Sequence, residues 1–100
     1  MHSEVSICIP RIGCFSSKRD IHTVLEKYNL GSISRIDIVG HKNSRRAFIH
    51  FDHWNKESPI ARTILNRLNN REKVNIIHSF PWYWRCVKSR LKIPDLANNN

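Results

Sequence analysis

Acidic side chains are scarce in this 100-residue chain, which carries 8 Asp and Glu against 17 Lys and Arg for a formal net charge of +9. The few carboxylates are scattered, and no pair has a spacing typical of acid–base catalysis. A glycine-rich phosphate loop, a nucleophile elbow and a zinc-ligand spacing are also missing. The sequence therefore predicts a protein that is not an enzyme and uses no cofactor and no metal. Its positive charge favours a polyanionic partner.

Long apolar runs and paired cysteines are missing as well. No apolar stretch approaches the roughly 20 residues that span a bilayer, and residues 1–10 lack the basic start and cleavage site of a signal peptide. Cys8, Cys14 and Cys86 are an odd and widely spaced set, which is typical of reduced thiols. We expect an intracellular protein, cytoplasmic or nuclear, without a membrane partner.

Apolar and polar residues alternate with the period of a β-strand in several segments. Near the C-terminus two more segments are strand-like, with Pro81 between them, and they predict a final strand with an additional hairpin arm. The predicted strands cover residues 4–12, 32–39, 45–52, 74–77 and 82–91.

Two segments have the features of helix starts. Ser17 is followed three residues later by Asp20, and Ser58 is followed directly by Pro59. Each start precedes an amphipathic stripe with helical spacing. Gly31 is expected to end the first helix in a left-handed conformation.

The order of these elements is βαββαβ. It predicts one α+β domain, a ferredoxin-like sandwich in which two helices cover one face of a four-stranded antiparallel sheet. Right-handed connections give the strand order 4-1-3-2 and leave the second face of the sheet open. The predicted domain covers residues 1–92, and residues 93–100 are expected to be a disordered tail.

Two of the predicted strands resemble the signatures of the RNA recognition motif (RRM) family. The five residues 47–51, Ala-Phe-Ile-His-Phe, fit the end of the third-strand signature, and residues 7–12 fit the apolar positions of the first-strand signature. The resemblance implies an RRM-like fold that binds RNA, with Phe48 as a ring on which a base stacks. The sequence departs from the family where Cys8 and Arg46 replace the other two stacking rings and Arg45 replaces a glycine.

A third segment points to an origin. Residues 80–85, Phe-Pro-Trp-Tyr-Trp-Arg, are similar to a segment of RRM-like proteins encoded by large DNA viruses. The abundance of Ile, Asn and Lys agrees with the AT-rich genomes of such viruses. A viral protein is therefore expected.

The last strand has two possible registers, which exchange the two faces completely. The first puts Trp82 and Trp84 on the open face, together with Lys88 and Arg90. The second puts Trp84 in the core and turns the intervening side chains, Tyr83, Arg85 and Val87, outward. The first is favoured because Lys88 and Arg90 resist burial.

The leading hypothesis is binding of single-stranded RNA, or of single-stranded nucleic acid generally, through base stacking and phosphate contacts on the open face. The alternative is a protein-interaction or self-association module, such as a homodimer, with the Trp82–Trp84 aromatic cluster as a hot spot or with an exposed edge strand as the contact. The candidate binding residues are Arg46, Phe48, His50, Cys8, Trp82, Trp84, Lys88, Arg90 and Arg45.

Overall fold

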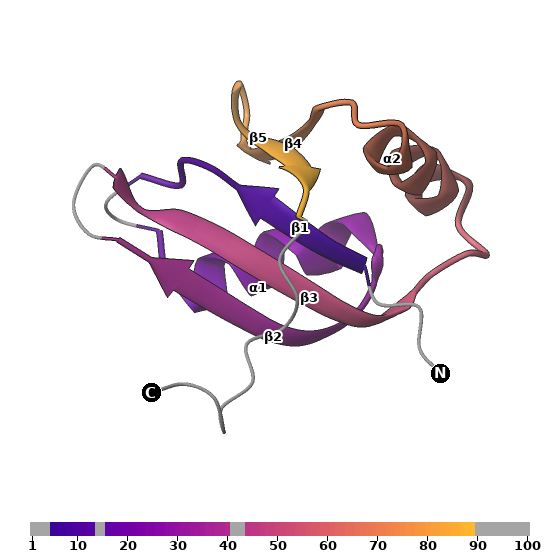
Figure 1. Ribbon diagram of the computed structural model, residues 1–100, viewed down its shortest axis with the longest axis horizontal. Coiled ribbons are helices and arrows are strands. Elements are labelled where there is room, and N and C mark those ends of the chain that lie inside the picture. Colours follow the sequence, from indigo (N-terminus) through magenta and orange to yellow (C-terminus); the bar gives the residue numbers. More distant parts are fainter. Residues whose placement is uncertain (1–4, 14–15, 41–43, 90–100) are drawn as a thin grey trace.

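The computed structural model describes residues 5–13, 16–40 and 44–89 of the chain (Figure 1). This part of the sequence forms five strands and two helices. In chain order they are β1 (Val5–Ile9), α1 (Lys18–Tyr28), β2 (Gly31–Val39), β3 (Arg46–Trp54), α2 (Pro59–Asn69), β4 (Val74–Ser79) and β5 (Trp82–Lys88).

The strands form one antiparallel five-stranded sheet with the order β2-β3-β1-β5-β4. The predicted four-stranded ferredoxin-like sheet with the order 4-1-3-2 is therefore wrong. The segment expected to be a mere hairpin arm forms a complete edge strand, β4, beyond β5. It does so because Val74 and Ile76 alternate inward, are buried, and pair with Cys86 and Trp84 of β5.

Both predicted helix starts are confirmed. The Ser17 hydroxyl accepts a hydrogen bond from the Asp20 N–H at 3.1 Å, and the Asp20 carboxylate accepts one from the Ser17 N–H at 3.0 Å. The Ser58 hydroxyl accepts from the Ala61 N–H at 3.2 Å. These bonds satisfy N–H groups that the first turn of a helix leaves without a partner.

The expected helix end at Gly31 is wrong by two residues. Asn29 is the left-handed cap of α1, with φ of 55°. Gly31 instead begins β2 with φ of 148°, and a Cβ there would lie 2.1 Å from the carbonyl oxygen of His53. Glycine is needed at this position because the backbones of β2 and β3 approach so closely.

The hydrophobic core lies on one side of the sheet. Alternate residues of β1 and β3 point into it, and the buried stripes of both helices pack against them in one cluster. Trp54 ties β3 to α2, since its indole Nε1 donates a hydrogen bond to the Ala61 carbonyl at 2.8 Å. The core residues on these four elements are Val5, Ile7, Ile9, Ala47, Ile49, Phe51, Trp54, Ile21, Leu25, Ala61, Ile64 and Leu68.

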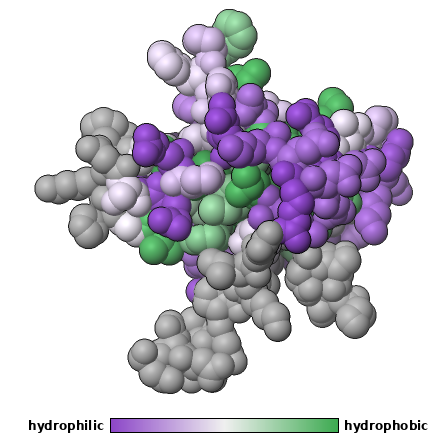
Figure 2. Space-filling view, turned by 45° about the horizontal axis from the view of Figure 1, so that its top comes forward, coloured by the Kyte–Doolittle hydropathy of each residue, from purple (hydrophilic) through white to green (hydrophobic). Residues whose placement is uncertain are grey.

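The β4–β5 hairpin projects from the rest of the molecule, at the top of Figure 1. β5 pairs with β1 through Ile7–Lys88 and Cys8–Val87. The buried Trp84 anchors the hairpin in the core, and within the hairpin its ring stacks on His78 of β4 with ring centroids 4.5 Å apart. In Figure 2 hydrophobic side chains appear at the projecting end, whereas the surface over α2, at the right, is mostly hydrophilic. The hairpin end is therefore the more apolar of these two surfaces.

Within the described ranges, no helix is long and apolar enough to cross a membrane.

Candidate nucleic-acid interface

The site is built on the face of the sheet that points away from the helices, which we call the open face. Strand alternation decides its members, because every second side chain of a strand points to the same side. Ser6 and Cys8 of β1 pair with His50 and Phe48 of β3 across this face, and Cys8 pairs with Val87 of β5 on its other side. The described open face contains Ser6, Cys8, Arg35, Asp37, Val39, Arg46, Phe48, His50, Asn75, Ile77, Tyr83, Arg85 and Val87.

On the β2 side of the open face, four polar side chains form a connected network. The Ser6 hydroxyl lies 2.8 Å from His50 Nδ1, His50 Nε2 lies 3.4 Å from a carboxylate oxygen of Asp37, and Arg35 Nε donates to the other carboxylate oxygen at 2.8 Å. Because a carboxylate only accepts, we place the imidazole hydrogen on Nε2, so that Nδ1 accepts from Ser6. We call these four residues the polar network.

Burial controls the protonation of His50. Its side chain is 1% exposed, and burial lowers its pKa below the ordinary value of 6.5, while the neighbouring Asp37 carboxylate works in the opposite direction. In a serine–imidazole–carboxylate arrangement the imidazole can take the hydroxyl proton while the carboxylate orients the ring. Ser6, however, is itself only 9% exposed, so the arrangement favours a structural role over attack on a substrate.

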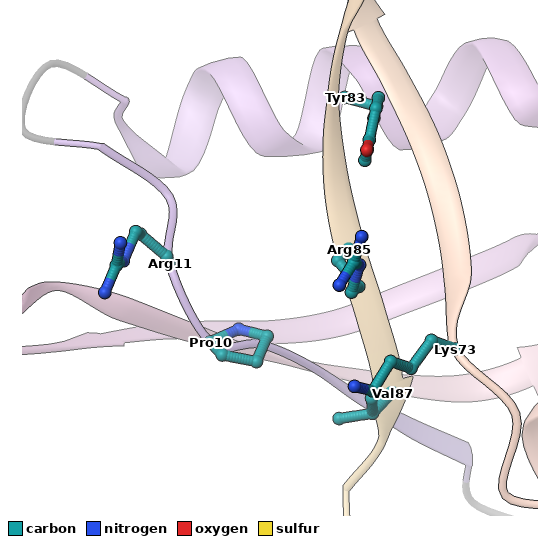
Figure 3. Close-up of a pocket in the computed structure, with 6 residues that line it drawn as sticks. All are labelled: Pro10, Arg11, Lys73, Tyr83, Arg85 and Val87. Carbon is teal, nitrogen blue, oxygen red and sulfur yellow. The ribbon is translucent and has the colours of Figure 1, made fainter.

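On the β5 side, the open face is hollowed between the segment after β1 and the β4–β5 hairpin. The hollow has a volume of about 490 Å³. Figure 3 shows Tyr83, Arg85 and Val87 along β5, with the Lys73 ammonium reaching toward Val87 from the start of β4 and Arg11 on the opposite side. We call this feature the basic hollow, and it is lined by Pro10, Arg11, Lys73, Tyr83, Arg85 and Val87.

The charged residues that line the basic hollow all have the same sign. Three of its lining residues are cationic and none is acidic. Tyr83 adds an aromatic ring that is 46% exposed. Cations beside an accessible ring can hold a phosphate and a stacked base at the same time.

Cys8 lies on β1 between the two parts of the open face. Burial raises the pKa of its thiol, and the nearby Arg46 works in the opposite direction. Cys86 lies in the core, where burial raises its pKa to about 12. Both thiols are therefore poor nucleophiles at neutral pH.

The β3 part of the predicted site is on the open face. Arg46 is exposed, Phe48 is half-buried and His50 is buried. Arg45 lies beside the face, where its Nη1 donates to the Gly13 carbonyl at 3.3 Å.

The favoured register of the last strand is wrong. Trp84 and Cys86 are buried on the helix side, and Lys88 is on that side too, with its Nζ donating to Asn69 of α2 at 2.8 Å. Burial of the large Trp84 ring outweighs exposure of Lys88, because a lysine stem can cover apolar surface while its ammonium stays at the rim. Trp82 lies beside the hairpin turn and is 68% exposed. Arg90 and the tail at residues 93–100 are outside the described residues.

The strongest part of the site was not among the favoured candidates. Tyr83 and Arg85 belong to the rejected register, so the alternation did contain a signal for them. Arg11 and Lys73 were not among the predicted site residues, because only the fold brings them together.

In the part of the chain that the structure describes, no group of three or more His, Cys, Asp or Glu residues could hold a metal ion.

Comparisons with known protein families, with curated proteins and with solved structures found no match. The resemblance to the RRM family and the viral origin therefore stay predictions.

Proposed function

We propose that the open face binds single-stranded nucleic acid, with RNA as the first candidate. The observation that carries this proposal is the basic hollow, which Arg11, Lys73 and Arg85 line together with the ring of Tyr83 and without a carboxylate. Phe48 supplies a second ring on the same face. The net charge of +9 supports the same class of partner.

The proposed mode of binding divides the work between rings and cations. Bases stack on Tyr83 and Phe48, and phosphates contact Arg85, Arg11 and Arg46. Stacking on a protein ring contributes about 1–3 kcal/mol per base, and phosphate contacts make the affinity fall with salt. Binding by both kinds of contact needs unpaired bases, which favours single strands over duplexes.

Fluorescence anisotropy tests the proposal with RNA and DNA oligonucleotides of one sequence, each single-stranded and as a duplex, at low and high salt. The double variant Phe48→Ala/Tyr83→Ala removes both rings without changing the net charge. We expect its affinity for single strands to fall at least about tenfold, from the loss of stacking.

A matched control is Phe80→Ala/Trp82→Ala, which removes two exposed rings at the hairpin turn. It should keep the affinity of the original protein. Undetectable binding of every oligonucleotide at low salt would contradict the proposal. If the two double variants lost affinity equally, the open face would not be the binding surface.

A second candidate function, self-association, is favoured by one observation. Phe80 and Trp82 at the hairpin turn are 85% and 68% exposed, and exposed apolar patches mark interaction sites. Light scattering at increasing protein concentration measures the oligomer directly. A dimer mass that Phe80→Ala/Trp82→Ala returns to the monomer supports this candidate, and a monomer mass at all concentrations opposes it.

A further inference from the structure

The cations at the basic hollow have no partner among the residues that the structure describes, whereas several other cations do. Arg35 and Arg67 form ion pairs with Asp37 and Glu72, and Arg62 donates a hydrogen bond to a backbone carbonyl. Within the described ranges, Arg11, Lys73 and Arg85 show no ion pair and no side-chain hydrogen bond to the protein. These three charges are therefore uncompensated at one place.

The place itself is concave. Pro10 and Val87 form an apolar part of the lining. In Figure 3 Arg11 lies on one side of the hollow, Arg85 lies on β5, and the Lys73 side chain comes from the other side to end beside Val87. A volume of about 490 Å³ is in the range of pockets that enclose a small ligand. A phosphate group with its nucleoside fits this scale, whereas a flat surface would favour an extended backbone.

The hollow also lies at a margin of the open face. Ile9 is the last residue of β1, and Pro10 and Arg11 follow it. Phe48 and Val87 flank Cys8 on either side, so they are about two strand spacings, roughly 10 Å, apart. A nucleic-acid strand that crosses from Phe48 over Cys8 and Val87 arrives at the hollow.

The chemistry favours the end of a strand over its middle. A terminal phosphate monoester carries a charge of about −1.5 to −2 at neutral pH and three strong acceptor oxygens, whereas a phosphate within the chain carries one negative charge. Arginine pairs with such oxygens in a two-pronged fashion, and lysine acts as a point charge. Three cations around one hollow match the more highly charged group.

We infer that the basic hollow binds the terminal phosphate of a single-stranded nucleic acid, with the adjoining base against the ring of Tyr83. This inference rests on the proposed function and adds end recognition to it. Arg11 and Arg85 hold phosphate oxygens, Lys73 adds the third charge, and Pro10 and Val87 contact the sugar.

The test uses the full chain and one oligonucleotide sequence in three forms: with a 5′-phosphate, with a 3′-phosphate and with hydroxyl groups at both ends. Affinities are measured at low salt. We expect one phosphorylated form to bind about tenfold more tightly than the hydroxyl form, the effect of one good hydrogen bond to a charged group. The preferred end gives the direction of the strand on the sheet.

Two triple variants locate the effect. Arg11→Ala/Lys73→Ala/Arg85→Ala should make the phosphorylated and hydroxyl forms bind equally. The control, Lys56→Ala/Arg62→Ala/Arg67→Ala, removes the same charge at α2 and the loop before it, and it should keep the preference. Circular dichroism confirms that both variants are folded.

The outcomes separate the inference from the proposed function. Equal binding of all three forms by the original protein overturns end recognition and leaves nucleic-acid binding intact. A preference that survives in the hollow variant overturns the location. No binding of any form overturns both claims.

Discussion

The two parts of the open face use their polar side chains in opposite ways. In the polar network, Ser6 is hydrogen-bonded to His50 and Arg35 to Asp37, and His50 Nε2 lies 3.4 Å from the Asp37 carboxylate. In the basic hollow, Arg11, Lys73 and Arg85 face a space without a lining carboxylate. Groups that bind one another stabilise a fold, whereas uncompensated charges contribute to binding and little to stability. We therefore expect the polar network to support the fold, and the basic hollow is the part of the face that we propose as the binding site.

The largest expected effect is on stability, from removal of His50. His50→Ala leaves a buried cavity and removes the side-chain partner of the buried Ser6 hydroxyl. We expect the free energy of unfolding to fall by about 3 kcal/mol. Arg85→Ala, at an exposed position, should change it by no more than about 0.5 kcal/mol. Urea denaturation measures both variants, and equal effects would abolish the distinction between the two halves.

The next effect is on affinity, where the order of the two halves reverses. Arg85→Ala should weaken binding of single strands about tenfold, or about 1.4 kcal/mol, and should lower the slope of log affinity against log salt by about one. Arg35→Ala removes the same charge from a guanidinium already bound to Asp37, so we expect a loss below about threefold. Anisotropy titrations at several salt concentrations decide the comparison. A larger loss for Arg35→Ala would place the binding surface on the network.

A smaller effect is the pH dependence of stability that His50 contributes. Because burial lowers its pKa in the folded state below the ordinary 6.5, the unfolded chain binds the proton more readily. The contribution to stability is therefore complete above pH 6.5 and is lost as the pH falls below it toward the folded-state pKa. His50→Gln, which keeps polar contacts but does not titrate, should flatten this part of the stability curve. An unchanged curve would mean that other groups cause the loss.

The smallest effect concerns the boundary between the halves. In a Cys14→Ser background, alkylation at mildly alkaline pH should modify the half-buried Cys8 slowly and Cys86 more slowly still, because burial raises the pKa of Cys86 to about 12. A bound oligonucleotide that crosses β1 should slow the modification of Cys8 further. Mass spectrometry follows the two thiols separately. Modification of Cys8 at an unchanged rate would confine the ligand to the hollow.

Local sequence signals predicted much of this molecule. Ser17 with Asp20 and Ser58 with Pro59 mark the helices because a cap depends on residues within one turn. Strict alternation in β3 predicted that Arg46 and Phe48 lie on one face of the sheet and Ala47 and Ile49 on the other. Patterns of this kind do not depend on the rest of the fold.

Local signals of this kind could not predict the register of β5 or the basic hollow. In β5 both faces carry large apolar groups, Trp84 with Cys86 against Tyr83 with Val87, so alternation alone does not choose between them. The register is decided by Trp84, which packs in the core and stacks on His78. The hollow combines Arg11 with Lys73, residues 62 positions apart in the numbering, and only the strand order brings them together.

The attachment of the β4–β5 hairpin has a consequence for how the protein opens. Its backbone joins β1 over two residue pairs, and the Ser89 N–H just after β5 donates to the Ser6 carbonyl at 2.8 Å. Side chains add to this attachment, with Trp84 buried and the Tyr28 hydroxyl accepting the Ile77 N–H at 2.8 Å. Segments held by few backbone bonds exchange their amide hydrogens through local unfolding. Because β1 pairs with β3 over five residue pairs and with β5 over two, we expect the hairpin to open away from β1 before β3 does. A ligand that contacts Arg11 and Arg85 together would fasten it to the sheet.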